Sequence, residues 1–182
     1  VGELGWELYV PINESKKIYE AIDLIGKKHN LVHAGRLAMD IMRMEKGYLH
    51  WGHDITPGEN PYEAGLGFAI KINKDVNFIG KDSLIKARNK KKKLIMLSLL
   101  ESKPGKPLLL HDEPIYFNGE IVGETTSGNY SFNYNKNLAF GYIKSDINIK
   151  DLKEAKFEIE VAKVKYPAKI ELEPLHDPKN YL

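Results

Sequence analysis

A short stretch of this sequence, residues 41–67, concentrates side chains that can do chemistry. It reads as the end of a helix followed by a turn-rich connection, and its glycines and prolines are what such a connection needs. The requirements of a turn-rich connection do not explain why arginine, carboxylate, aromatic and imidazole groups occur together on it. Loops that carry such groups are usually sites, because a rigid scaffold can hold them in place. The side chains concerned are Arg43, Glu45, Tyr48, His50, Trp51, His53, Asp54 and Glu63.

Arg43 offers clear recognition chemistry. A guanidinium presents a fixed fork of donors, which suits an anionic or carbonyl-rich ligand. The alternative is an ion pair with Asp40 or Glu45 on the surface of the same helix, which would contribute little to stability. We expect Glu45 to orient the loop rather than touch a ligand, and Glu63 to be mainly structural, with a role in the site as the lesser alternative.

His50, His53 and Asp54 could together ligate a metal, because imidazole and carboxylate are common ligands. Their spacing matches no helical zinc motif, and no further ligand cluster accompanies them in the sequence. We therefore expect no metal site, and expect His53 and Asp54 to fix the loop through hydrogen bonds to the backbone. We also expect no strong acid–base machinery among these residues.

The composition indicates a globular protein and excludes several classes of function. The chain has 182 residues, 42% of them hydrophobic and 29% charged, enough for a core in one domain or two small ones. It lacks an apolar run long enough to cross a bilayer. A net charge of +2 is too small to argue for nucleic-acid binding. The absence of cysteine excludes disulfides and fits a reducing compartment, so we expect a cytoplasmic protein that binds neither nucleic acid nor membrane.

The first half of the chain is expected to mix helices with short strands. The sequence enters a strand pattern at once, without an initiator Met, so we expect a piece of a longer polypeptide. Trp6, Leu8 and Val10 alternate with Glu7 and Tyr9, which is typical of a half-buried strand. Further predicted elements are a helix capped by Asn13 and ending near Gly26, a helix from about His33 with Leu37, Ile41, Met44 and Tyr48 on one face, a strand at 66–72 and a short helix at 78–88.

The run of four lysines at 90–93 has two interpretations. It could bind phosphate or RNA, or it could be a solvated helix end and linker. No aromatic platform is interleaved with it, which favours the linker. We place a domain boundary here, between a first unit at 1–92 and a second at 93–182.

The second unit is expected to consist of β-strands. Apolar or alternating segments recur at 94–100, 114–117, 120–126, 138–143, 157–161 and 164–172. Asn118 and Gly119 separate two of them and form the strongest short hairpin signal. Several short strands with regular turns predict a small antiparallel barrel or roll. The predicted fold class is therefore α+β, with a terminal β-barrel domain.

Six motifs occur one after another along nearly the whole chain. They are Gly2-Glu-Leu-Gly-Trp-Glu-Leu-Tyr-Val, Arg43-Met-Glu-Lys-Gly, Trp51-Gly-His-Asp, Asn60-Pro-Tyr-Glu-Ala-Gly-Leu-Gly, Phe78-Ile-Gly-Lys and Val122-Gly-Glu-Thr-Thr-Ser-Gly-Asn. Together they resemble the folate-binding T-protein (aminomethyltransferase) family of the glycine cleavage system. The form Glu45-Lys-Gly-Tyr-x-x-Trp-Gly-His-Asp resembles one branch, dimethylglycine and sarcosine dehydrogenases, in which a flavin-dependent domain precedes a T-protein-like tetrahydrofolate domain.

The resemblance implies that 1–92 is the C-terminal part of the folate-binding domain and that 93–182 is the family's C-terminal β-barrel. The parent enzyme would oxidise an N-methylated glycine on FAD, held in a preceding part of the polypeptide. The one-carbon unit would pass to tetrahydrofolate and give 5,10-methylenetetrahydrofolate. This chain would bind folate, contact the remainder of its own polypeptide and be inactive alone, because the family's N-terminal aspartate beside the folate amine is absent from it.

The same resemblance implies four folate-binding residues and no catalytic one. Glu3 matches the family glutamate that hydrogen-bonds the pterin, a role that suits a carboxylate because it can accept two hydrogen bonds; otherwise it is a strand-start residue in solvent. Arg43 matches an arginine in the folate cleft. Trp51, beside Tyr48, stands where the family usually has a tyrosine, and it either stacks on a folate ring or plugs the space between lobes. The polar groups of 125–129 would face the cleft.

Two other interpretations stay open. The chain could be the C-terminal part of a stand-alone aminomethyltransferase, which takes its carbon from a lipoyl-bound aminomethyl group. It could also be a non-catalytic folate-binding or assembly module that keeps the fold and has lost the chemistry. The family's usual Ser-Pro-Thr-Leu-Gly-Lys is replaced by residues 130–136, so ligand contact there is left open.

Overall fold

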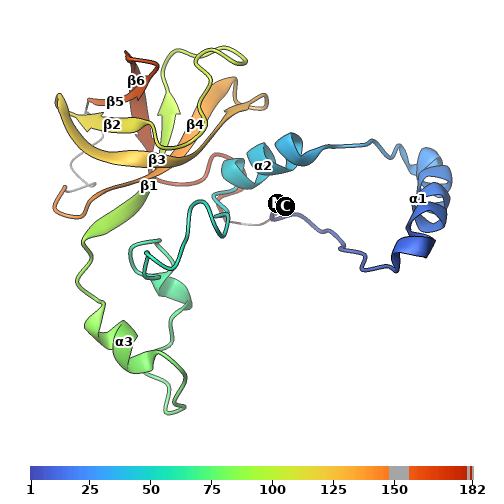
Figure 1. Ribbon diagram of the computed structural model, residues 1–182, viewed down its shortest axis with the longest axis horizontal. Helices are drawn as coiled ribbons and strands as arrows, with labels where there is room; N and C mark the ends of the chain where they lie inside the picture. Colours follow the sequence, from blue (N-terminus) through green and yellow to red (C-terminus); the bar gives the residue numbers. More distant parts are fainter. Residues whose placement is uncertain (148–155, 180, 182) are drawn as a thin grey trace.

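The computed structural model describes residues 1–147, 156–179 and 181, and combines a helical first half with a closed β-barrel (Figure 1). Three α-helices precede the barrel in the described part of the chain: α1 (Ile12–Gly26), α2 (Arg36–Glu45) and α3 (Lys81–Lys86). Of these, α2 lies against the barrel, where it packs on two of the strands. The structure confirms the predicted α+β class and the terminal barrel.

The barrel is built from six strands in the described residues. Around the barrel their order is β1-β4-β3-β2-β5-β6, and every neighbouring pair is antiparallel, with β6 pairing back onto β1. Closure removes the free strand edges that would otherwise invite aggregation. The strands are β1 (Lys92–Leu99), β2 (Pro114–Phe117), β3 (Glu120–Ser131), β4 (Lys136–Lys144), β5 (Phe157–Val161) and β6 (Val164–Glu171).

Local turn chemistry and small residues let the barrel close. Asn118 and Gly119 adopt φ values of 50° and 88°, the left-handed conformation that a tight two-residue hairpin requires, so the predicted β2–β3 hairpin is confirmed. Gly123 on β3 meets β4 so closely that a Cβ atom there would lie 1.8 Å from the carbonyl oxygen of Tyr142. Only glycine fits at that contact.

Strand β1 contributes to two apolar clusters because its side chains alternate between faces. Leu97 points into the barrel and joins the main core, whereas Met96 points outward and joins a second cluster with α2. The main core also contains Ile115, Ile143, Phe157 and Ile159, and the second cluster contains Ile41, Met44, Leu138 and Phe140. The second cluster is the apolar part of the contact between α2 and the barrel.

Two predicted strands are wrong. The segment at 6–10 is extended but pairs with no described strand, and Trp6 is 87% exposed, so its alternation does not mark a half-buried strand. The segment at 66–72 forms a short 3₁₀ turn, Gly67–Ala69 (η2), and further turns. It is preceded by Gly65 at φ +75° and by an Asx turn in which the Asn60 side chain accepts from the backbone of Tyr62, so the chain curls before a strand can start.

The helix predictions hold, with shifted ends. Helix α1 is preceded by Pro11 as its cap residue instead of Asn13, and α2 begins at Arg36 and ends at Glu45, so Tyr48 lies beyond it. The third helix, predicted at 78–88, is shorter and is preceded by Gly80, and two of the four lysines at 90–93 begin β1 instead of forming a linker. None of the helices in the described ranges is long and apolar enough to span a membrane.

Replacement of a core isoleucine tests the barrel interior. Ile159 on β5 is fully buried, so Ile159→Ala should lower the free energy of unfolding by about 2–5 kcal/mol through lost burial and the cavity left behind. Ile121 on the neighbouring hairpin is 57% exposed, and Ile121→Ala is the matched control, with an expected change of about 0.5 kcal/mol or less. Equal losses in chemical denaturation of the two variants would contradict the assigned core.

Candidate functional site

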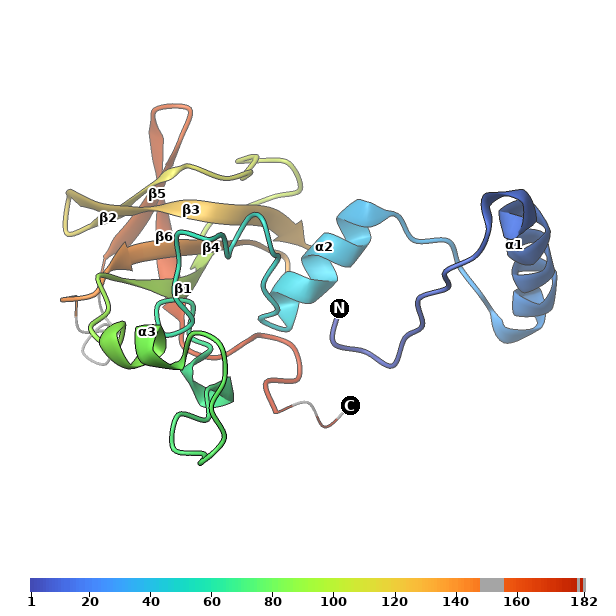
Figure 2. The ribbon, with the colours of Figure 1, turned by 60° about the horizontal axis from the view of Figure 1, so that its bottom comes forward.

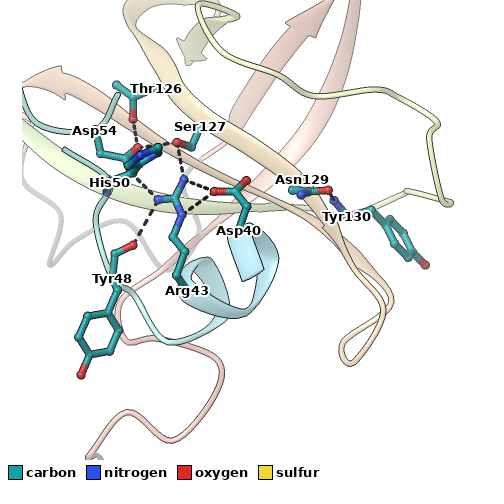
Figure 3. Close-up of polar contacts among 9 residues, drawn as sticks. All are labelled: Asp40, Arg43, Tyr48, His50, Asp54, Thr126, Ser127, Asn129 and Tyr130. Atoms are coloured by element: carbon teal, nitrogen blue, oxygen red, sulfur yellow. Dashed lines mark hydrogen bonds and ion pairs between the residues drawn. The ribbon is translucent and has the colours of Figure 1, made fainter. Parts of the chain in front are cut away.

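Arg43 lies on the last turn of α2, and its guanidinium points at the barrel (Figure 3). The residue is buried, and each of its five N–H donors has an acceptor. Nε and Nη2 both lie 2.8 Å from Asp40 Oδ1. Nη1 donates to the carbonyl oxygen of Tyr48 at 3.2 Å and to the carboxylate of Asp54, and Nη2 donates to Ser127 Oγ at 2.8 Å. In this arrangement all the donors of the guanidinium are bound by other groups of the protein.

Asp54 is the acceptor at the centre of this cluster and is fully buried. Its Oδ2 accepts from Arg43 and from the backbone N–H of His50 at 2.9 Å. Its Oδ1 accepts the hydroxyl protons of Thr126 at 2.6 Å and Ser127 at 2.8 Å. A buried carboxylate is tolerated only when it is paired and hydrogen-bonded in this way. The bond to His50 confirms the expectation that Asp54 fixes the loop backbone.

A β-bulge in β3 makes the contacts to Asp54 possible. In the register with β4, Thr125 pairs with Gly141 and Ser127 pairs with Phe140, which leaves Thr126 as an extra residue. Successive side chains of a regular strand point to opposite faces, and a bulge re-aims them. The bulge therefore allows two consecutive hydroxyls, Thr126 and Ser127, to reach the same carboxylate oxygen.

Glu45 forms a second polar contact between α2 and the barrel. Its carboxylate is buried and accepts from Ser131 Oγ at 2.5 Å and from the side-chain amide of Asn133 at 2.8 Å. Its carbonyl oxygen accepts from the backbone N–H of His176 at 2.9 Å. Glu45 therefore positions the end of α2 against the end of β3, in agreement with the expectation that it orients the loop.

Tyr142 on β4 connects the loop to the barrel wall. Its hydroxyl donates to the carbonyl oxygen of Asp54 at 2.8 Å, and the ammonium of Lys92 lies 4.6 Å from the centre of its ring. Burial, with further contributions from the carboxylates of Glu59, Asp54 and Glu63, raises the pKa of the Tyr142 hydroxyl. Each of these effects disfavours the negatively charged phenolate, so the hydroxyl remains a donor to the loop.

Lys46 joins the two ends of the chain at the C-terminus of α2. Its ammonium lies 3.0 Å from Glu3 Oε1, 2.9 Å from the carbonyl oxygen of Gly2 and 3.3 Å from Asp177 Oδ2. The hydrogen bond that Lys46 donates to Glu3 raises the pKa of Lys46, burial opposes this rise, and the hydrogen bond that it donates to Asp177 adds to it. The net direction favours the charged ammonium.

The structure places the four predicted folate-binding residues in three environments. Glu3 and Tyr48 lie on neighbouring segments: Gly2, next to Glu3, packs so closely on the Tyr48 ring that a Cβ there would lie 2.5 Å from Cε2. Tyr48 also lines a largely apolar cavity of about 620 Å³ between the loop, the barrel and the C-terminal tail. Arg43 is buried in the cluster described above, and Trp51 is 68% exposed on the turn that follows, with a backbone bridge to Ile55.

Sequence reasoning missed Lys46 and Asp177 as partners, because one ends a helix and the other lies in the C-terminal tail. It found the polar run at 125–129 but not its partner Asp54. Glu63 is structural as expected, since its carboxylate accepts from the backbone N–H groups of Asn60 and Lys91.

His53 and His111 line a second cavity, of about 670 Å³, and the three rings of His50, His53 and His111 lie near one another at tilted angles. The ring of His53 lies 4.6 Å from that of His50 and 6.5 Å from that of His111. Among the residues that the structure describes, no group of three or more His, Asp or Glu side chains could hold a metal ion.

Neutralisation of Asp54 tests the central ion pair. Asp54→Asn leaves the buried guanidinium of Arg43 without its charged partner and replaces an acceptor by an amide. It should lower the free energy of unfolding by about 3–5 kcal/mol, as is typical when one member of a buried pair is removed. Asp75→Asn, in an exposed turn, is the control with an expected change below about 0.5 kcal/mol. Similar denaturation midpoints for Asp54→Asn and the unmodified protein would show that the pair does not hold the loop.

The raised pKa of Tyr142 predicts an alkaline effect on stability. A pKa that is higher in the folded state contributes stability that is complete below the pKa of an unfolded tyrosine, about 10, and is lost as the pH rises from there. Tyr142→Phe should therefore flatten the loss of stability above about pH 10. It should also cost about 1 kcal/mol at neutral pH through the missing hydrogen bond. Denaturation curves between neutral pH and pH 11 measure both effects; an unchanged slope would contradict the assignment.

Comparison with known proteins identifies the family. Residues 1–74 match the model of the GCVT N-terminal domain, and residues 92–177 match that of the glycine cleavage T-protein C-terminal barrel domain. The chain is 37% identical to a mitochondrial sarcosine dehydrogenase of Mus musculus over 99% of its own length and 20% of the relative. It is 39% identical to a mitochondrial dimethylglycine dehydrogenase of Homo sapiens over 96% of its length and 20% of the relative. The chain thus spans about a fifth of the length of these relatives.

A solved structure shares the fold. The glycine cleavage system aminomethyltransferase T from Bartonella henselae superimposes with a TM-score of 0.77 at 20% identity, over 93% of this chain and 45% of the other. The two family models together cover both halves of the chain, and the barrel in the structure is the one that the second model describes. This chain therefore belongs to the glycine cleavage T-protein family.

Proposed function

We propose that this chain is the tetrahydrofolate-binding portion of an enzyme like dimethylglycine or sarcosine dehydrogenase. In such an enzyme a one-carbon unit from an N-methylglycine passes to tetrahydrofolate and gives 5,10-methylenetetrahydrofolate. The observation that carries the proposal is the identity of 37–39% to dehydrogenases of these two names over almost the whole chain. The flavin would bind in another part of the polypeptide.

In this proposal residues 1–92 are the C-terminal part of the folate-binding domain, and 93–182 are its barrel domain. Exposed apolar side chains support the idea that the first unit packs against further chain. Helix α1 lies away from the barrel on extended connections (Figure 1), all its residues are described, and none of them is buried. Leu24 and Ile25 on α1 are 67% and 61% exposed. The remainder of the same polypeptide is the partner that would cover this surface.

The residues beside the 620 Å³ cavity fit a flat heterocyclic ligand. Its apolar lining suits the faces of a ring, and Tyr48 could stack on it. The carboxylate of Glu3 is held next to Lys46, a residue that lines the cavity, and can accept from amino and N–H groups at the edge of a pterin. Tetrahydrofolate would supply the amines that capture the one-carbon unit.

Arg43 and Trp51 take different parts in this proposal. Because all five donors of Arg43 bind protein acceptors, Arg43 would act by holding the loop that carries Tyr48 and not by a direct ligand contact. The exposed ring of Trp51 would be available to stack on a folate ring or to pack against another part of the polypeptide.

A substitution at Glu3 tests the proposed folate site in the full-length protein. Glu3→Gln should weaken tetrahydrofolate affinity by about 1–3 kcal/mol, the range for losing hydrogen bonds to a charged group. Isothermal titration calorimetry measures the change, and Glu101→Gln, at an exposed position of the barrel, is the matched control that should bind like the unmodified protein. The proposal would be contradicted by a full-length protein that binds no tetrahydrofolate, or by a Glu3→Gln variant whose tetrahydrofolate affinity is unchanged.

The C-terminal part of an aminomethyltransferase is the second candidate, and the shared fold with the Bartonella henselae protein favours it. The donor of the carbon separates the two. Formation of 5,10-methylenetetrahydrofolate from sarcosine or dimethylglycine supports the dehydrogenase, and formation only from a lipoyl-bound aminomethyl group supports the transferase. Tight folate binding without turnover of either donor would identify a non-catalytic module.

A further inference from the structure

The ammonium of Lys46 is enclosed by acceptors from both ends of the chain. The side chain is only 1% exposed. Its three partners are Glu3 Oε1 at 3.0 Å, the carbonyl oxygen of Gly2 at 2.9 Å and Asp177 Oδ2 at 3.3 Å. An ammonium has three donors, so the three acceptors satisfy it completely. A buried lysine with a full set of acceptors is a fixed point from which its partners can be positioned.

The contact leaves one oxygen of Glu3 available. Both ion contacts of the Glu3 carboxylate with described residues use Oε1: Lys46 at 3.0 Å and His176 Nε2 at 3.8 Å. The Glu3 side chain is 37% exposed. A carboxylate anchored through one oxygen has its plane restricted while the other oxygen can still accept from a ligand. Anchoring of this kind lowers the entropy that a flexible glutamate would lose on binding.

The third partner of Lys46 belongs to a tail that is itself tied down. After β6 the chain returns to the end of α2, and this returning segment lies on the same side of that helix as the first residues of the chain (Figure 2). Leu175 packs into the cluster between α2 and the barrel, and its carbonyl oxygen accepts from the hydroxyl of Tyr134 at 2.8 Å. Pro174 packs on Gly47, where a Cβ would lie 2.7 Å from the proline ring. Asp177 is therefore held next to Lys46 by the segment at 172–177, which we call the C-terminal strap.

We propose that Lys46 is a positioning residue that holds Glu3 for ligand binding, and that the C-terminal strap at 172–177 holds Lys46 through Asp177. The inference rests on the proposed function of Glu3 and deepens it. The strap connects the barrel domain, through Lys46, to the carboxylate of Glu3 near the opposite end of the sequence. Loss of Asp177, which does not itself line the 620 Å³ cavity, loosens Glu3 through Lys46.

Hydrogen exchange of the full-length protein tests the tether without any ligand. Lys46→Met keeps the length and apolar stem of the side chain and removes the charge. It should increase amide exchange at residues 2–8, and Asp177→Asn should do so to a smaller extent because two acceptors of Lys46 remain. Lys92→Met is the matched control: it breaks another ion pair, with Glu59 at 2.5 Å, on the barrel side of the molecule. Unchanged exchange at 2–8 in both Lys46→Met and Asp177→Asn overturns the proposal.

Tetrahydrofolate affinity tests the link to the ligand. Lys46→Met should weaken binding about tenfold, the lower end of the loss seen when a residue that orients a metal ligand is removed, which is a comparable positioning role. In a Glu3→Gln background the same substitution should change affinity by less than about twofold, because the two residues act as one unit. A merely structural lysine would instead give losses that multiply in the double variant, and that result contradicts the positioning role.

The outcomes distinguish this inference from the function on which it rests. If Lys46→Met does not fold, Asp177→Asn keeps the inference testable, because it leaves the lysine and two of its acceptors in place. If Glu3→Gln weakens binding and a folded Lys46→Met does not, the positioning role fails and the proposed function stands. If exchange at 2–8 rises in Lys46→Met while Glu3→Gln binds tetrahydrofolate normally, the tether stands and the folate role of Glu3 falls.

Discussion

The buried ion pair between Arg43 and Asp54 is the interaction on which the rest of this structure depends. It joins α2 and the loop that follows it to the bulge of β3, which lies 73 residues beyond Asp54 in the sequence. Removing both charges from water costs several kcal/mol, and their attraction offsets this only because every remaining donor and lone pair is occupied. The hydroxyls of Thr126 and Ser127 supply that occupation. The pair therefore specifies one geometry for the loop more than it adds net stability.

The last turn of α2 is a junction of three polar contacts. Arg43 reaches the bulge, Glu45 reaches the end of β3, and Lys46 reaches both termini. Arg43 and Glu45 are two residues apart and point in different directions, and Lys46 lies just beyond the end of the helix, so this short segment can hold three separate partners. The apolar cluster around Met44 fills the space between helix and barrel. The loop that carries Tyr48 begins at this junction, so the barrel fixes where the candidate site lies.

Much of the fold could be predicted from local pattern. The barrel strands show alternation or apolar runs, and Asn118-Gly119 has the backbone preference that its turn requires. The segment at 6–10 alternates equally well but forms no sheet, because alternation marks a strand only when a partner strand is present. The segment at 66–72 is apolar enough for a strand, yet the glycine and Asx turns before it bend the backbone first.

The sequence by itself determined the family, the barrel class and the residue types of the candidate site, because each depends on motifs or periodicities within short segments. Only the tertiary structure decided which groups meet. Arg43 and Ser127 are 84 residues apart, and their contact depends on a one-residue bulge that exists only in the register with β4. Lys46 meets Glu3 and Asp177 because the fold returns its last segment to the end of α2. Contacts of this kind depend on how strands pair and on where the chain folds back against earlier segments, and no local sequence pattern encodes either.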